Sequence, residues 1–217
     1  MKIKAGSGAD KSFRPAGWIL IGAAAVMLLG AAIGFLAPSL RDAPWTDDPQ
    51  LAAVTIAGNP AAYAWANGLI LAASIITAIG FVPACAQFRG ASRPWAWSAV
   101  IAFALAAGFE SLDRTISIQV YTWAATQDLQ ITDPAIRTFI LFQEGLSNLF
   151  YWLGFLAIGL FGVALLSGPH GSGLGWVFVA GCVLGIGLHL AGGAIPAMIF
   201  FGTAAIGGVI VLSDRLE

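Results

Sequence analysis

The chain contains six apolar stretches, and each is long enough to cross a lipid bilayer as a helix, which takes about 20 residues. A bilayer offers no water to unpaired backbone groups, so stretches of this kind fold as helices. The sequence therefore predicts an all-α, polytopic membrane protein that forms one domain over residues 1–217. Its six transmembrane helices are expected near residues 16–38, 61–84, 94–112, 147–167, 173–190 and 193–212.

The composition agrees with this class of protein. Of the 217 residues, 59% are hydrophobic and 10% are charged, whereas a soluble domain carries about 25% charged residues. The formal net charge is −1, and without a basic stripe we expect no nucleic-acid partner. Cys85 and Cys182 lie in different apolar stretches, so we interpret both as small buried apolar groups. We predict no metal site and no other cofactor.

The N-terminal segment predicts the orientation of the chain. Residues 1–15 are basic, and the apolar stretch that follows is longer than the 7–15 residues of a cleavable signal peptide. We therefore expect a cytoplasmic tail followed by a retained anchor. Positive charges collect on the cytoplasmic side of a membrane, which predicts a multi-pass, N-in/C-in protein of the cytoplasmic (inner) membrane. The predicted inner charges are Lys2, Lys4, Lys11, Arg14, Arg89, Arg93 and Arg215, and the outer ones are Arg41, Arg114 and Arg137.

Two outer loops are predicted, over residues 39–60 and 113–146. In the first, Thr46 can cap a short extra helix, and Asn59 followed by Pro60 is typical of the start of the next membrane helix. In the second, Pro134 marks the start of a helix that would run for about 50 Å. Such a helix exceeds the hydrocarbon layer of about 30 Å, so either its first turns project outward or Gly145 marks a bend.

Glycine pairs at a spacing of four occur in "GAAIG" (Gly30, Gly34) and in "GCVLG" (Gly181, Gly185). Small residues at this spacing let two helices approach closely. Packing within one bundle is the simpler interpretation, and a membrane-protein partner or a homo-oligomer is the alternative.

Charged residues interrupt the third apolar stretch in "AAGFESLDRTISIQ", which contains Glu110, Asp113 and Arg114. Positions 110, 113, 114 and 117 share one helix face. Counted from Trp95 at 1.5 Å per residue, Glu110 is expected in the outer part of the hydrocarbon layer. Polar residues of other helices are expected at the same depth. The candidate pocket or ligand-binding residues are Asn67, Glu110, Asp113, Arg114, Glu144, Asn148 and His189.

Several functions fit this group of residues. The simplest interpretation is an ion pair between Glu110 and Arg114 at i,i+4, with hydrogen bonds between helices. Beyond that, we expect a non-catalytic protein with an outward-facing polar pocket for a small molecule or lipid, or a docking site for a partner protein. The alternatives are a small proton-coupled transporter and an intramembrane enzyme using Glu110, Glu144 and His189. We assign no catalytic residue, because the two histidines, His170 and His189, are predicted on opposite faces of the membrane.

Two segments carry a family resemblance: "AGNPAAYAWANGLILAASIITAIGFVPACAQFRG", and "LGFLAIGLFGVALLSG" at residues 153–168. With the six-helix layout, they resemble an uncharacterised bacterial family of small integral membrane proteins known only as a domain of unknown function. The resemblance covers the chain from about Trp18 to Leu212. It implies the six-helix architecture and brings no activity with it.

Overall fold

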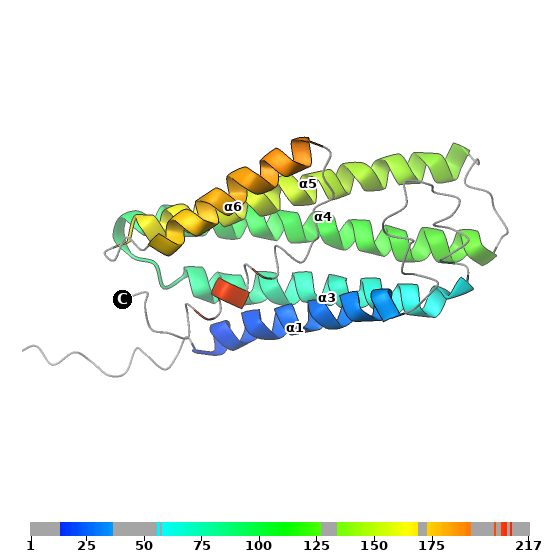
Figure 1. Cartoon of the computed structure of the whole chain (residues 1–217), viewed down its shortest axis with the longest axis horizontal. Coiled ribbons are helices and arrows are strands. Elements are labelled where there is room, and N and C mark those ends of the chain that lie inside the picture. Colours follow the sequence, from blue (N-terminus) through cyan, green and yellow to red (C-terminus); the bar gives the residue numbers. More distant parts are fainter. Residues whose placement is uncertain are drawn as a thin grey trace, which may run out of the picture. The chain divides into compact units, whose positions relative to one another are not determined.

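The structure, a computed structural model, describes residues 14–36, 56, 58–126, 134–168, 173–191, 202, 205–207 and 209. All regular structure in these residues is helical (Figure 1). Five of the described helices are long and apolar enough to cross a membrane, which confirms the prediction of an all-α protein with several membrane-length helices. The elements are α1 (Arg14–Leu36), α3 (Pro60–Cys85), the short 3-10 helix η2 (Gly90–Ser92), α4 (Arg93–Thr126), α5 (Pro134–Leu166) and α6 (Gly173–Leu190).

Three predictions lie wholly or mostly outside the described residues. Of the sixth predicted span, 193–212, the structure describes 202, 205–207 and 209. Of the predicted basic tail it describes residues 14 and 15, and of the predicted first outer loop it describes 56 and 58–60. The sixth span, the tail and the short extra helix therefore stay predictions.

Local sequence signals explain where α3 begins and how the chain turns between α3 and α4. The Asn59 side-chain oxygen accepts a hydrogen bond from the Ala62 backbone N–H at 3.2 Å, which confirms the predicted cap of α3. After α3, Gly90 takes a φ of 56°, a left-handed conformation that favours glycine. The Ser92 hydroxyl donates to the Arg89 carbonyl oxygen at 2.7 Å and closes this turn.

Helices α4 and α5 are longer than the apolar stretches that predicted them. The predicted third span ended at residue 112, whereas α4 continues to Thr126 and has 34 residues. Charged residues lower the hydropathy without stopping a helix, and no glycine or proline lies between Gly108 and Pro134. The helix α5 begins at Pro134, stays helical through Gly145 and has 33 residues. Within the predicted outer loop over 113–146, the helical residues 113–126 of α4 were not predicted, whereas the predicted helix start at Pro134 is confirmed.

The helices divide into two compact units, which we describe separately. Unit 1 contains Met1–Ala24, Ile76–Ala102 and Phe155–Glu217, and unit 2 contains Ala25–Ile75 and Phe103–Gly154. Each of α1, α3, α4 and α5 contributes a segment to both units, whereas α6 belongs to unit 1.

Aromatic rings and glycines dominate the packing of unit 1. The buried Phe161 ring of α5 lies 5.3 Å from the ring of Phe81, 5.7 Å from that of Phe88 and 5.2 Å from that of Phe178. Along α6, the buried Gly185 lies directly against the Phe155 ring of α5. These contacts fasten α6 to α5 without any polar side chain.

Glycine also sets the register between α1 and α3 in unit 2. A Cβ atom added at Gly30 would lie 3.0 Å from both the Ala66 carbonyl oxygen and the Leu69 Cβ atom. By contrast, no described atom lies within 4 Å of such a Cβ at Gly34 or at Gly181. In each predicted glycine pair, one glycine therefore packs against a neighbouring helix of the bundle.

Candidate functional site

One face of α4 in unit 2 is largely buried from Ala106 to Ser117, and it changes from small apolar to polar side chains. The exposed fraction is 0% at Ala106, 1% at Glu110, 1% at Asp113 and 0% at Ser117. The steps of three and four residues between them keep these positions on one helix face. Leu112, on another face, is 53% exposed. The buried face of α4 is thus formed mainly by alanines in its first half and by charged and polar side chains from Glu110 onward.

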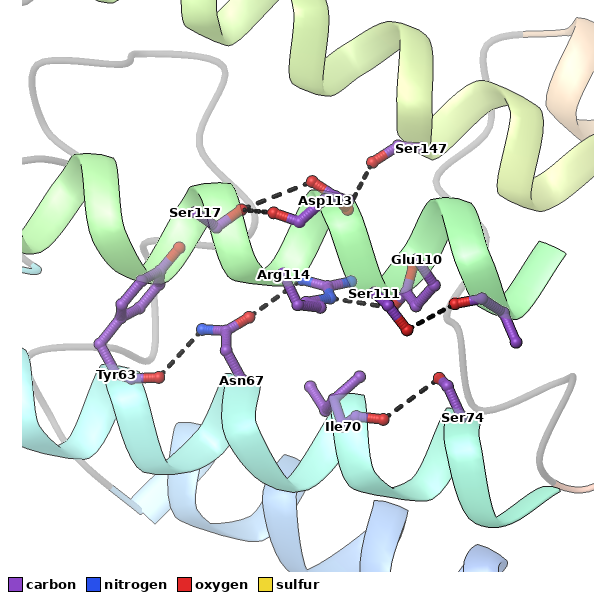
Figure 2. A network of polar contacts seen from close by, with 11 residues as sticks. Tyr63, Asn67, Ile70, Ser74, Glu110, Ser111, Asp113, Arg114, Ser117 and Ser147 are labelled. Atoms are coloured by element: carbon purple, nitrogen blue, oxygen red, sulfur yellow. Dashed lines mark hydrogen bonds and ion pairs between the residues drawn. The ribbon is translucent and has the colours of Figure 1, made fainter. Parts of the chain in front are cut away.

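The first half of the buried network joins α4 to α3 (Figure 2). The Arg114 Nε donates to Glu110 Oε1 at 2.8 Å, which confirms the predicted i,i+4 ion pair. The Arg114 Nη1 donates to the Asn67 side-chain oxygen at 3.0 Å, and the Asn67 amide nitrogen donates to the Tyr63 carbonyl oxygen at 3.0 Å. Asn67 is held by its own helix and presents its oxygen to the guanidinium.

The second half of the network joins α4 to α5. The Ser147 hydroxyl donates to Asp113 Oδ2 at 2.9 Å. The Ser117 hydroxyl lies 2.8 Å from the Asp113 carbonyl oxygen and 3.4 Å from Asp113 Oδ1. Because a hydroxyl carries one hydrogen, the shorter of these two bonds takes most of its donating capacity. Of these two serines, Ser147 is thus the better donor to the Asp113 carboxyl group.

Tyrosines surround the charged groups on three helices. The rings of Tyr63 on α3 and Tyr121 on α4 meet edge to face, with centroids 6.1 Å apart. Figure 2 shows the Tyr63 hydroxyl directed toward Ser117. Tyr63, Tyr121 and Tyr151 of α5 all lie close enough to Asp113 to interact with its charge. Three hydroxyl groups that can donate or accept hydrogen bonds therefore lie in the neighbourhood of the network.

The charges of the network do not balance. Glu110 and Asp113 against Arg114 leave a formal charge of −1 when all three are ionised, and both carboxyl groups are 1% exposed. Among the described residues, no donor lies within hydrogen-bond distance of Glu110 Oε2, which is itself buried. A buried carboxylate that lacks a compensating charge or donor is strongly disfavoured. The arrangement therefore favours one additional positive charge.

The network lies inside the apolar part of the helices. Gly30 of α1 packs beside Ala66, next to Asn67, and α1 continues from Gly30 through six more residues to Leu36. Those residues extend about 9 Å beyond the level of the network. On α4, the helix continues for twelve residues past Arg114. The charges are thus not at a helix end, although the sequence placed Asp113 and Arg114 near the outer boundary of the membrane.

The structure joins three of the seven candidate residues directly, since Arg114 bonds both Glu110 and Asn67, and Asp113 lies on the same buried face of α4. Glu144 and Asn148 are exposed, so their depth, from which they were made candidates, does not bury them with the charges of α4. Ser147 lies at the edge of the buried face of α5, which Leu146 and Phe150 form, whereas residues 144 and 148 lie on the exposed side of the helix. His189 belongs to α6 in unit 1 and is half-buried. The network belongs to unit 2, so the predicted proximity of His189 to the network stays a prediction.

Five polar side chains of the site were not among the candidates: Tyr63, Ser117, Tyr121, Ser147 and Tyr151. Their spacing carried a signal, since positions 117 and 121 extend the face of Glu110 and Arg114 by one and two turns. Hydroxyl-bearing residues are common in membrane helices, and only a charged partner on a neighbouring helix distinguishes those that matter here.

Replacing Asn67 by alanine is expected to lower the free energy of unfolding by about 1 kcal/mol, because Arg114 loses its acceptor on α3. The measurement is unfolding of the purified protein in mixed micelles by titration with sodium dodecyl sulfate. Asn148→Ala is the matched control, since Asn148 is exposed and its loss should change stability by less than about 0.5 kcal/mol. Equal losses for the two variants would contradict a structural bond at Asn67.

No protein-family model matches the chain, and comparison with curated proteins and with solved structures gives no match. The resemblance to the six-helix membrane family therefore stays a prediction.

Proposed function

We propose that the chain is a non-catalytic, multi-pass protein of the cytoplasmic membrane whose buried polar network binds and releases a proton. Both termini lie on the cytoplasmic side in this proposal. Because Arg114 belongs to a buried helix face, two predicted outer positive charges, Arg41 and Arg137, stand against the seven predicted inner ones. The positive-inside rule counts loop charges, so the longer α4 supports this orientation.

The observation that carries the proposal is the pair of buried carboxyl groups that share one guanidinium. An unpaired carboxylate at the centre of a membrane helix costs about 2.5–3.5 kcal/mol on the insertion scale. A proton removes that charge, and it needs no cavity and no set of ligands. Since Glu110 and Asp113 are each 1% exposed, a proton is the cation that suits their close packing best.

A small proton-coupled transporter is the second candidate. The position of the network inside apolar helices favours it, because ionisable residues within membrane segments commonly form proton relays. A small molecule or lipid bound in an outward-facing pocket, and a docked partner protein, stay predictions from the sequence.

Infrared difference spectroscopy of the protein in lipid nanodiscs, stepped from mildly alkaline to mildly acidic pH, tests the proposal. A carboxyl group that takes up a proton in an apolar site gains a C=O band that shifts on deuteration. We expect such a band in the wild type and its loss in the double variant Glu110→Gln, Asp113→Asn. The control Glu144→Gln removes an exposed carboxyl group of the same unit and should keep the band.

Two results would overturn proton binding. One is a pH-induced carboxyl band that persists unchanged in the double variant. The other is a wild type that shows no such band but whose spectrum responds to added Na⁺ at constant pH, which would assign the additional positive charge to a metal cation.

A further inference from the structure

The buried network has two parts that differ in charge. In the first, Glu110 and Arg114 form an ion pair at 2.8 Å that Asn67 extends to α3, so this part is neutral. In the second, Asp113 contacts the hydroxyl groups of Ser117 and Ser147. Those hydrogen-bond partners are uncharged, and although Arg114 also interacts with the charge of Asp113, its ion pair is with Glu110. The less compensated carboxyl group is therefore the one that joins α4 to α5.

We infer that Asp113 is the carboxyl group that exchanges the proton, and that Ser147 transmits its charge state to α5; this inference rests on the proposed function. Glu110 is the poorer candidate despite its unpartnered Oε2, because its Oε1 accepts a charge-assisted bond from Arg114 and its charge is already compensated by that ion pair. Asp113 has Ser147 at 2.9 Å and a shared bond from Ser117 at 3.4 Å. When Asp113 is protonated, the apolar interior contains the Glu110–Arg114 ion pair, which has no net charge, and the uncharged acid form of Asp113.

Proton exchange changes the covalent state of Asp113 and, with it, the hydrogen bond between Asp113 and Ser147. A hydronium ion donates the proton: one of its O–H bonds breaks and leaves water, an O–H bond forms on an Asp113 carboxyl oxygen, and the network goes from a formal charge of −1 to 0. The Ser147 hydroxyl donates to the ionised carboxylate, and it can accept a bond from the protonated acid. Hydrogen bonds to an ionised acceptor are roughly twice as strong as neutral ones. Proton binding therefore loosens the contact between α4 and α5 and leaves the contact between α4 and α3 unchanged.

Other ionisable groups face Asp113 and require their own controls. Arg114, Glu110 and Tyr121 lie on α4 itself, Tyr63 lies on α3, and Tyr151 lies on α5. Glu144 of α5 is exposed but interacts with Tyr121. The segment of α1 in unit 2 has no ionisable side chain. Tyr121→Phe and Glu144→Gln test whether these neighbours contribute to the signal.

The infrared band of the single variants shows which carboxyl group takes up the proton. We expect the pH-induced carboxyl band to vanish in Asp113→Asn and to persist in Glu110→Gln. If the band vanishes in Glu110→Gln and persists in Asp113→Asn, the protein binds a proton but our assignment is wrong. If neither single substitution nor the double variant changes it, the proposed function fails as well. Should Asp113→Asn not fold, Ser147→Ala serves instead: a band from Asp113 must shift when that hydroxyl is removed, whereas a band from Glu110 must not.

Hydrogen–deuterium exchange tests the transmission to α5. On acidification, peptides around Ser147 should exchange about two- to tenfold faster, while peptides around Asn67 on α3 should not change. The Ser147→Ala variant should still show a carboxyl band, at a shifted frequency, and should lose the response of α5. An equal response of the α3 and α5 peptides, or an unchanged response in Ser147→Ala, would overturn the role of Ser147.

Discussion

Replacing Arg114 by methionine is expected to lower the free energy of unfolding by about 3–5 kcal/mol, the typical cost of removing one partner of a buried ion pair. The substitution leaves Glu110 and Asp113, both 1% exposed, with no cation among their contacts in the described part of unit 2. It also removes the charged donor to Asn67. Unfolding by sodium dodecyl sulfate in mixed micelles, followed by circular dichroism, provides the measurement.

Two further variants separate the ion pair from other effects of losing an arginine. Arg93→Met removes an exposed arginine from the first turn of the same helix and should cost less than about 0.5 kcal/mol. The double variant Glu110→Gln, Arg114→Met should recover part of the loss, because it removes one of the uncompensated carboxylates. A double variant less stable than Arg114→Met alone would mean that Glu110 is stabilised by something other than Arg114.

Replacing Gly185 by alanine is expected to lower the free energy of unfolding by about 2–3 kcal/mol, because the new Cβ atom would overlap the buried Phe155 ring. Gly181→Ala lies one turn earlier on α6, where no described atom lies within 4 Å of the new Cβ. Alanine is the better helix former by about 1 kcal/mol, so this control should be neutral or slightly stabilising. The difference between the two variants in the same unfolding titration isolates the steric contact.

The partner of Gly185 can be tested from the other side as well. Phe155→Leu shortens the side chain that fills the space beside the glycine, so combining it with Gly185→Ala should recover part of the lost stability. Similar losses at Gly181 and Gly185 would instead indicate that both glycines face another chain, as in the dimerisation alternative.

The sequence predicted helix ends well where a specific residue ends the helix. The predicted fifth span, 173–190, has the bounds of α6, and the predicted second span, 61–84, differs from α3 by one residue at each end. The end of α4 could not be found in the same way, because the prediction used the first charged residues as the boundary. Charge marks where a chain is expected to leave the lipid, whereas a helix ends where its backbone conformation or hydrogen bonding fails.

Predicting the site met a similar limit. The face shared by Glu110, Asp113 and Arg114 follows from helical spacing on one helix, so the sequence identified it. The contribution of α5 depends on how that helix is rotated about its axis. Ser147 and Asn148 are adjacent and both polar, and a rotation of 100° decides which of them faces Asp113. Depth along a helix can be counted from the sequence, but rotation depends on the packing of its neighbours.

Arg114 and Asp113 bond partners on opposite sides of them in the sequence, and this has a consequence for biosynthesis. Arg114 finds Glu110 within its own turn of helix, and Asn67 lies 47 residues upstream, so both partners have been synthesised when α4 leaves the ribosome. Ser147 lies 34 residues downstream of Asp113. At 5–20 residues per second, Asp113 waits about 2–7 s for its partner on α5. During that interval Asp113 lacks the hydrogen bond from Ser147, and the shared bond from Ser117 on its own helix is the one available.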